Sequence, residues 1–508
     1  MSYYKRMMVW FRAHWWVVIL IVAVGMYLPA LRNGFVWDDE EQVVNNQFIR
    51  EWRNLPQLFT GSTFGGGGTA SLTGGYYKPL LSVWFLINYK LWGLYPWGWH
   101  LTQSVLHGIN GVLVYYLLLS VLKKHQRWLA GLGALIWVVH PVQVESVAYI
   151  SAVQELLMTA LSLAAILLAI KGKLKVSLGL WGLALLAKES AVVVPVIVAA
   201  YIWMVEKKIN RVVDYSMGCL LILGGYALLR FGVAGVGLKP HEIIPITAAP
   251  LWQRLLTVPE SLYQLVRVIF WPVYLYIGHH QVVTGVIWRW VGELLLLLSL
   301  ITRLRGWFGW WVAVSVVLIS NLFPLDMTFA ERWAYFPLIG IIGLVMVGIS
   351  QWPKRWVIMM GGVLILALGT RSVVRMKDWQ NGLTLYNHDI ALAPPAFDLE
   401  NNLGVELARV NQWDEAKIHF ERSIVLQPEW WTNYSNLGAY FQRRGQLEIA
   451  KTLYLEAIKN GDYYLAYENL AGIYWQQKDK ELEPFLTGAL AKFPYNRQLQ
   501  AIYAATKK

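Results

Sequence analysis

Four consecutive carboxylates, Asp38, Asp39, Glu40 and Glu41, follow the first long apolar run of this 508-residue chain. Such a cluster at the rim of a membrane segment is costly to place, so it needs open water or a positively charged partner. Adjacent carboxylates repel, so one can hold a proton or act as a base while a cation steadies the other. We predict that Asp38 and Asp39 are catalytic and mark a cavity at the outer face of a membrane protein. The pair could instead be a solvated loop or a helix cap.

Other polar residues interrupt the apolar sequence and have two readings each. Lys78 and Arg332 could contact phosphate, because the planar fork of an arginine suits phosphate oxygens, or each could balance a neighbouring acid. Lys188 and Glu189 could pair with each other or with the site. The histidines, such as His140 before Pro141, could end a helix or face a packed interior with satisfied nitrogens.

The composition indicates a membrane protein with many spans. Hydrophobic residues make up 56% of the chain and charged residues 15%, whereas a soluble protein carries about 25% charge. The net charge of +13 is distributed in small basic clumps between apolar runs, which suits cytoplasmic loops better than a nucleic-acid surface. The single cysteine, Cys219, lies in an apolar run, which excludes disulfides within the chain and cysteine-based zinc sites.

The apolar runs and the basic residues between them predict an all-α fold with about eleven membrane helices. Basic residues at 5–12 place the N-terminus in the cytoplasm, and the first run is expected to be a start-transfer helix without a cleavage site. The predicted spans are 15–31, 100–122, one that ends near 140, 146–170, two that turn at 188–189 and end before 207, 212–230, 282–301, 307–323, 335–349 and 356–370.

Two stretches between the spans are predicted to lie outside the hydrocarbon core. The outer loop 32–99 contains the mobile glycine run 65–68 and a helix at 79–95 in the membrane interface. A second outer loop covers 239–259. The apolar stretch 262–277 is predicted to be interfacial or re-entrant, because a full span there would break the charge asymmetry downstream.

An odd number of spans places the C-terminal part on the same outer side as the acidic motif, which is extracellular, periplasmic or luminal. The polar outliers gather on that face, where a site in a membrane protein is expected. They are Asp38, Asp39, Lys78, His100, His140, Glu145, Lys188, Glu189, Glu331 and Arg332.

The composition changes after Arg371, and the chain is polar and periodic from about Asp398 to the end. Leu403-Gly404 recurs 34 residues later as Leu437-Gly438, and a looser third copy lies near Leu470. This period predicts tetratricopeptide repeats, whose small residues let the two helices of a pair approach closely. Residues 378–394 predict a helix that caps the array. The predicted parts are a membrane core at 1–373, a connecting segment at 374–397 and repeats on the outer side at 398–508.

Six short motifs, taken in order, resemble a known family when the repeats are added. They are Val36-Trp37-Asp38-Asp39, Tyr77-Lys78-Pro79-Leu80, Pro96-Trp97-Gly98-Trp99-His100-Leu101, His140-Pro141-Val142 with Glu145, Ala187-Lys188-Glu189, and Ala330-Glu331-Arg332 with Tyr335 and Pro337. The family is that of the transmembrane-and-tetratricopeptide-repeat O-mannosyltransferases and their prokaryotic relatives, within the GT-C class of membrane glycosyltransferases. The chain departs from it at Lys78, where arginine is common, in having about three repeats, and in the two acids after the aspartate pair.

The resemblance implies transfer of a sugar, mannose, from a polyprenyl- or dolichyl-phosphate carrier to hydroxyl groups of proteins on the extracytoplasmic face. Asp38 or Asp39 would deprotonate or orient the acceptor. Lys78, Arg332 and Lys188 would bind the donor phosphate. The residues expected to support the site are His100, His140, Glu145, Glu189, Glu331 and Tyr335.

General chemistry agrees with this implication. Transfer from a lipid phosphate needs a base for the acceptor and positive charge for the departing phosphate, and the chain has no phosphate-binding glycine loop of the nucleotide-binding kind. We expect no metal and no cofactor besides the lipid-linked donor, no nucleic-acid partner, and an acceptor protein or peptide that the repeats could hold.

Two other functions fit the same residues. One is a non-catalytic membrane scaffold in which the repeats bind partners and the charges are structural. The other is an enzyme of the same fold that glycosylates a glycolipid or a cell-surface polymer. A transporter is disfavoured, because the charged residues gather at one face and no paired broken helices mirror each other.

Overall fold

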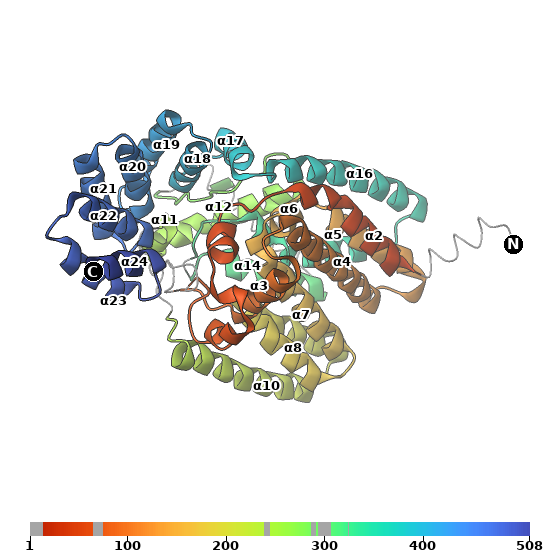
Figure 1. The fold of residues 1–508 in the computed structure, drawn as a ribbon. Helices are drawn as coiled ribbons and strands as arrows, with labels where there is room; N and C mark the ends of the chain where they lie inside the picture. The colour runs from red at the N-terminus through yellow and green to blue at the C-terminus, as the bar shows by residue number, and fades with distance from the viewer. Residues whose placement is uncertain are drawn as a thin grey trace.

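The structure, a computed structural model, describes residues 14–64, 75–237, 244–285, 291–292, 306–323 and 325–507. Within these residues the chain forms helices and short helical turns, and the β pairing is limited to one isolated bridge between His279 and Phe329. The predicted all-α fold class is confirmed. Figure 1 shows the apolar helices packed together and the C-terminal helices, α18 to α24, gathered at one end of the molecule.

Several helices are long and apolar enough to cross a membrane, so the chain is a multi-pass membrane protein. The described residues hold six such stretches, or seven if the bent pair Arg127–Val139 and Pro141–Ala148 is one span. The predicted count of about eleven is not confirmed. The predicted span 282–301 and the glycine run 65–68 lie largely outside the described residues. The six stretches are Trp15–Arg32, Pro96–Val121, Ile150–Ile170, Glu189–Glu206, Ile209–Val233 and Lys354–Asp378.

These helices pack against one another. The long ones are α2 (Trp15–Met26), α4 (Pro96–Val121), α5 (Arg127–Val139), α7 (Val153–Ile170), α10 (Ile209–Ala227) and α16 (Lys354–Asp378), and the shorter ones are α8 (Leu174–Ala187), α9 (Val194–Tyr201), α14 (Gly306–Ile319) and α15 (Pro337–Gly348). Helix α4 lies against α2, α5 and α7. A Cβ atom at Gly111 would lie 2.5 Å from Val138 and 2.9 Å from Ile19, so this glycine permits the close approach typical of membrane helices.

Two helices expose apolar side chains on the outside of the bundle. Leu221 of α10 is 77% exposed and Leu366 of α16 is 72% exposed. A contiguous surface of this kind is unfavourable in water but not against lipid tails. The two helices therefore form edges of the bundle that suit contact with lipid.

The outer segment between α2 and α4 consists of short helical turns followed by α3 (Pro79–Trp92). The helix begins at a proline in its first position and ends at Gly93, whose positive φ of 57° reverses the chain. It packs against α4, α7 and α8. The helix predicted at 79–95 is therefore present, and its N-terminus places Lys78 at the edge of the bundle.

The predicted continuous span 146–170 is broken in the structure. Helix α6 (Val144–Ala148) ends, Tyr149 is extended, and a short turn leads into α7 at Val153. The break has a tertiary cause, because the backbone N–H of Ser151 donates to Asp39 of the outer segment at 2.8 Å.

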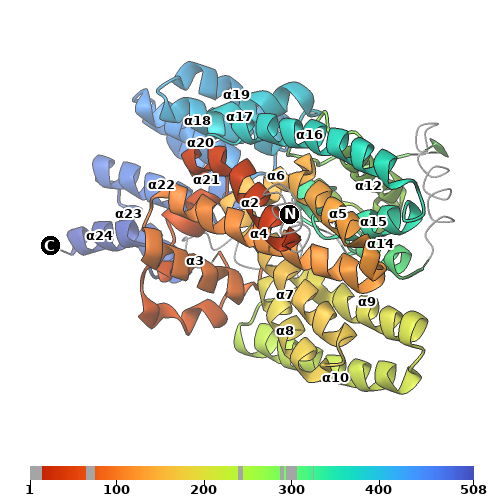
Figure 2. The same ribbon diagram turned by 90° about the vertical axis from the view of Figure 1, so that its right-hand side faces the viewer.

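The predicted outer loop 239–259 differs from the structure, and one helix runs through the predicted domain boundary at 373. Helix α12 (Leu251–Phe270) begins inside that loop and contains Pro259, which removes one backbone hydrogen bond from the helix. Helix α16 passes residue 373 to Asp378, since Arg375 pairs with Asp389 at 2.7 Å. Figure 2 shows α16 leading into α17 (Gly382–Leu392), which lies in the predicted connecting segment.

The polar C-terminal part forms the predicted solenoid of helical pairs. The pairs are α18 (Phe397–Arg409) with α19 (Trp413–Leu426), α20 (Trp431–Arg443) with α21 (Leu447–Asn460), and α22 (Tyr464–Gln477) with α23 (Leu482–Lys492), followed by α24 (Arg497–Thr506). A Cβ at Gly404 would lie 2.5 Å from Phe420, and one at Gly438 would lie 2.8 Å from Tyr454. The repeated glycines therefore allow the close packing within each pair that the period predicts.

Candidate active site

The two predicted catalytic aspartates have different surroundings. Asp39 is fully buried and accepts three hydrogen bonds, from Val36 N at 3.1 Å and from Ser151 N and Oγ at 2.8 and 2.6 Å. Burial raises the pKa of Asp39 to about 7, although these donors oppose the rise. The contacts favour a structural role for Asp39, which ties the outer segment to the turn before α7.

Asp38 faces the charged groups of distant segments. Trp37, the residue before it, has a positive φ of 56°, which is unusual for a residue with a side chain. Burial raises the pKa of Asp38, while Tyr149, Arg332 and Lys78 oppose the rise. A partly buried carboxylate with a raised pKa next to cations is suited to accept a proton.

Arg332 is held by the predicted residue Glu145. Its backbone N–H donates to Glu145 Oε2 at 2.8 Å, and its guanidinium forms an ion pair with the same carboxylate. The Cζ atom of Arg332 also lies 5.5 Å from the centre of the Trp37 ring. Glu145 therefore fixes the arginine where its charge acts on Asp38.

Lys78 is the third member of this cluster. Its ammonium lies 4.8 Å from the centre of the Tyr76 ring, and no carboxylate of the described chain lies within 4.0 Å of it. Burial lowers the pKa of Lys78 to about 8, and Lys188 adds to this effect while Glu189 opposes it. An anionic ligand would therefore meet a cation that is not already neutralised by a direct ion pair.

Lys188 and Glu189 pair with other residues. Lys188 forms an ion pair with Glu155 of α7, and Glu189 forms one with Arg230. Both residues act on Lys78 electrostatically, so they lie beside the site. This arrangement fits the alternative in which the two residues balance charge there.

The remaining predicted residues lie in packed regions and make structural contacts. His140 accepts from Val142 N at 3.2 Å and donates to Ile269 O at 2.9 Å, which stabilises the bend after α5. Tyr335 bonds His107 at 2.8 Å. Glu331 accepts from Tyr276 N at 2.6 Å. His100 is buried within α4 beside the backbone of residues 33 and 34.

Asp326, Tyr76 and Tyr149 also belong to the site but were not predicted. Asp326 accepts from the hydroxyl of Tyr76 at 3.2 Å, and it acts electrostatically on Asp38 and Lys78. A lone acid in the apolar stretch 307–330 is a signal that could have identified Asp326. No comparable signal marks the two tyrosines in a chain with 27 of them.

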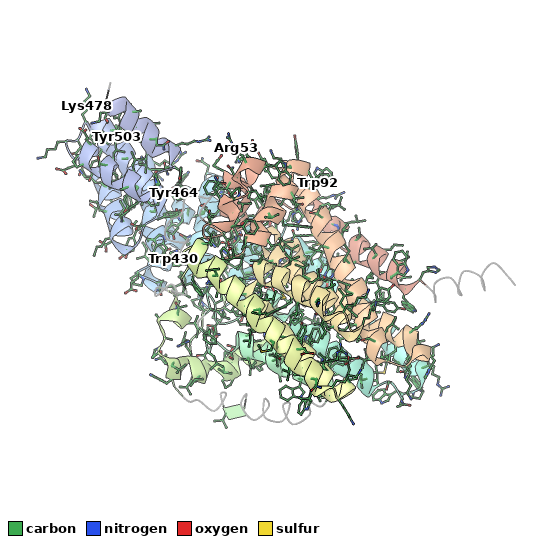
Figure 3. All side chains as sticks on the ribbon, turned by 90° about the horizontal axis from the view of Figure 1, so that it is seen from below. Arg53, Trp92, Trp430, Tyr464, Lys478 and Tyr503 are labelled. Atoms are coloured by element: carbon green, nitrogen blue, oxygen red, sulfur yellow. The ribbon has the colours of Figure 1, made fainter. Side chains whose placement is uncertain are left out.

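The last two acids of the motif contact the solenoid. Glu40 lies 3.2 Å from Arg409 of α18, and Glu41 accepts from the hydroxyl of Tyr464 of α22 at 3.3 Å. Burial raises the pKa of Glu41 to about 7. Figure 3 labels Tyr464 where the solenoid meets the outer segment. The motif therefore connects the repeats with the site around Asp38.

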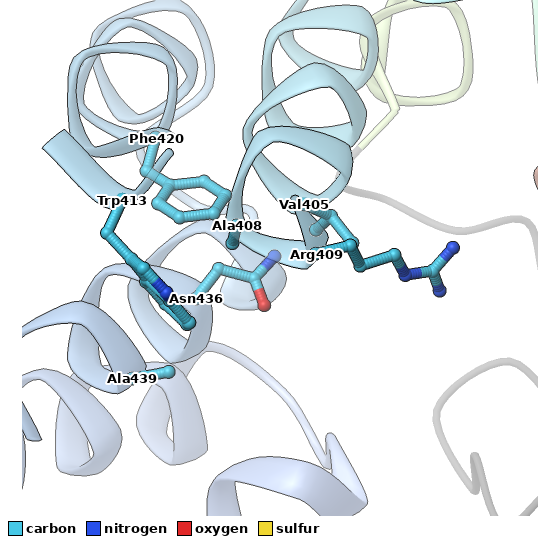
Figure 4. A pocket seen from close by; sticks show the side chains of 7 residues that line it. All are labelled: Val405, Ala408, Arg409, Trp413, Phe420, Asn436 and Ala439. Carbon is cyan, nitrogen blue, oxygen red and sulfur yellow. The ribbon is translucent and has the colours of Figure 1, made fainter. Parts of the chain in front are cut away.

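Arg409 also borders a groove of about 240 Å³ in the solenoid. The groove is lined by Val405, Ala408, Arg409, Trp413, Phe420, Asn436 and Ala439. Figure 4 shows the guanidinium of Arg409 pointing away from Trp413 and Phe420. A second cavity, of about 120 Å³, lies beside His280 where the solenoid meets the membrane part.

The described part of the chain holds no group of three or more His, Cys, Asp or Glu side chains arranged to bind a metal ion. Metal independence remains a prediction.

The chain was compared with known proteins. No family model matches it. It is 32% identical to protein O-mannosyl-transferase F38B6.6 of Caenorhabditis elegans over 159 residues, which are 31% of this chain and 23% of that protein. It is 30% identical to protein O-mannosyl-transferase TMTC3 of Mus musculus over 156 residues, 31% of this chain and 17% of that protein. The matches thus span about a fifth of these relatives, and they confirm the resemblance predicted from the motifs.

Comparison with solved structures gives weaker likenesses. The crystal structure of ArnT from Cupriavidus metallidurans bound to undecaprenyl phosphate aligns with a TM-score of 0.43 and 14% identity, over 97% of this chain and 88% of that one. The Cut9–Hcn1 hetero-tetramer of APC/C aligns with a TM-score of 0.24 and 12% identity, over 85% and 96%. Both TM-scores are low, and the all-α fold class follows from the helices of this chain themselves.

Proposed function

We propose that this protein is a membrane glycosyltransferase that transfers mannose from a polyprenyl-phosphate carrier to hydroxyl groups of protein acceptors on the extracytoplasmic face. The sequence relatives are named protein O-mannosyl-transferases, which supports the sugar and the kind of acceptor. The main support for the proposal is the cluster around Asp38, because Arg332 and Lys78 act on this carboxylate although they lie in segments far apart in the sequence.

The cluster can supply what this reaction needs. The acceptor oxygen attacks the anomeric carbon of the sugar, and its proton passes to Asp38. The bond from the anomeric carbon to the phosphate oxygen breaks, and its electron pair stays on the phosphate. The singly charged phosphodiester becomes a doubly charged monoester, and Arg332 and Lys78 stabilise the added charge.

The surroundings of the site favour a lipid-borne donor and a protein acceptor. Lys78 lies at the N-terminus of α3, which packs against the membrane helices, so a phosphate on a lipid could reach it from the bilayer. The repeats touch Glu40 and Glu41 next to Asp38, which supports placing them on the same side of the membrane, where they would hold the acceptor.

The experiment is mass spectrometry of outer-side proteins from cells that carry the natural protein or its Asp38→Asn variant. We expect hexose-bearing Ser and Thr peptides to disappear in the variant. Glu51→Gln is a matched control, because Glu51 is an exposed acid of the same outer segment that pairs with Lys90 at 3.5 Å. Unchanged peptides with loss of sugar from a glycolipid or a polymer would identify another acceptor, and no change in any glycan would contradict the proposal.

A further inference from the structure

Tyr149 is held rigidly beside the candidate base. Its ring stacks on Trp37, with ring centres 5.3 Å apart and planes 16° apart, and on Trp379, at 5.7 Å and 24°. The side chain is 3% exposed. Since the two indoles come from the outer segment and from the end of α16, the direction of the hydroxyl is fixed by three separate parts of the chain.

The Tyr149 hydroxyl lies beside Asp38 at the charged centre of the site. It is an electrostatic neighbour of Asp38, Asp39 and Arg332, close enough to favour the charged form of Asp38. Its oxygen makes no well-formed hydrogen bond in the described chain, and Asp38 is the acid close enough to receive one. Buried hydroxyls are normally paired, and this one, beside a base and a cation and without a well-formed bond to the described residues, is placed to donate to a bound ligand.

Tyr149 is suited to donate a hydrogen bond and not to accept a proton. Burial raises the pKa of Tyr149 well above its usual value, and Asp38 and Asp39 add to the effect. The hydroxyl therefore stays protonated. Asp38 is the adjacent proton acceptor, and Arg332 is the adjacent cation, so the donor lies where a base and an anion site meet.

We propose that Tyr149 is a further catalytic residue, whose hydroxyl donates a hydrogen bond to the phosphate oxygen that leaves the sugar. This inference rests on the proposed function. During the transfer Tyr149 keeps its proton, the acceptor proton goes to Asp38, and the electron pair of the broken carbon–oxygen bond stays on the phosphate. Because negative charge grows on that oxygen in the transition state, a fixed donor there stabilises the transition state more than the bound donor.

The test uses the purified full-length protein with synthetic mannosyl-phosphoryl-polyprenol and a serine- and threonine-containing peptide. Tyr149→Phe keeps the ring and both stacks but removes the hydroxyl. We expect kcat to fall by about 10- to 100-fold while KM for the donor changes by less than about 2-fold.

Tyr27→Phe is the matched control. Tyr27 is fully buried, its hydroxyl also lacks a partner, and its ring contacts His107 at 5.3 Å instead of facing Asp38. We expect wild-type kcat and KM from this variant. Equal thermal unfolding temperatures of the two Phe variants would show that Tyr149→Phe is folded. If it is not, fluorotyrosine at position 149 keeps the shape and strengthens the donor, and kcat should change.

The outcomes separate this inference from the proposed function. Wild-type kinetics for Tyr149→Phe, a rise in KM alone, or no response to fluorination would overturn the role of Tyr149. Those results together with loss of transfer in Asp38→Asn would leave the proposed function standing. Full transfer by Asp38→Asn in the same assay would instead overturn the proposed function itself.

Discussion

At the scale of residues, the acidic motif divides into parts with different tasks. Asp39 is enclosed by donors from Val36 and Ser151, whereas Asp38 faces Arg332 and Lys78. The sequence pointed to both aspartates, but it could not distinguish them, because Ser151 lies 112 residues away from Asp39. The positive φ at Trp37, just before the pair, was not predictable either, because a tryptophan rarely adopts it.

The predicted phosphate contact of Lys78 should weaken as the pH rises. Burial lowers the pKa of Lys78 to about 8, so its charge is present below that pH and is lost as the pH rises through it. We expect kcat/KM for the donor to fall above about pH 8, as a cation that binds phosphate is neutralised. In the profile of kcat the fall should lie at higher pH, because the bound phosphate favours the charged lysine.

The pH–rate profile of Lys78→Arg gives the check, because a guanidinium stays charged over this range. The alkaline fall is expected to disappear in this variant. In Lys78→Met, kcat/KM should drop by about 10- to 100-fold at neutral pH, the usual effect of losing a charged hydrogen bond. An identical alkaline limb in the wild type and Lys78→Arg would rule out this role.

At the scale of elements, helices that follow from local pattern were predicted and those shaped by distant contacts were not. The helix at 79–95 and the repeats depend on apolar periodicity and glycine spacing, which are local. The break at Tyr149 depends on Asp39, 112 residues from Ser151, and the extension of α16 past residue 373 involves a pair between Arg375 and Asp389 of the next helix. Single-sequence reasoning has no access to such contacts.

Replacing either of two glycines in the repeats with alanine should change the stability of the solenoid, in opposite directions at the two positions. Gly404→Ala would place a Cβ 2.5 Å from Phe420, so it should destabilise the first repeat by about 1–3 kcal/mol. Gly472→Ala in α22 meets no atom within 4 Å, so it should stabilise its helix by about 0.5–1 kcal/mol. Hydrogen exchange of the solenoid amides in the full chain measures both. Equal effects of the same sign would contradict the packing described.

At the scale of the molecule, the solenoid is docked against the membrane part near the site. Besides Glu40 with Arg409 and Glu41 with Tyr464, His280 lies 2.9 Å from Asp398. The two extra acids of the motif looked like a departure from the family pattern. Their partners lie in the repeats, so their task becomes visible only when the two parts are seen together.

This docking should weaken as the pH rises. Burial raises the pKa of Glu41 to about 7 in the docked state, so the docked state favours the protonated acid. The stabilisation is complete below the ordinary pKa of a glutamate and is lost as the pH rises through about 7. Glu41→Gln resembles the protonated acid and should dock independently of pH.

Spin labels at the exposed residues Arg53 and Lys478, on the two sides of this contact (Figure 3), report the docking as a distance distribution. Between about pH 6 and about pH 8 the distribution should broaden in the natural protein and stay narrow in Glu41→Gln. Broadening of the same size in both proteins would assign the pH response to other groups.

Transfer by the purified protein tests the central claim, that Asp38 receives the acceptor proton at a phosphate site formed by Arg332 and Lys78. Mannose transfer from a polyprenyl-phosphate donor to a hydroxyl peptide is measured for the natural protein, Asp38→Asn and the surface control Glu51→Gln. We expect Asp38→Asn to lower kcat by about 10²- to 10⁴-fold, as loss of a general base does, and Glu51→Gln to match the wild type. Equal transfer by Asp38→Asn and the natural protein would contradict the claim.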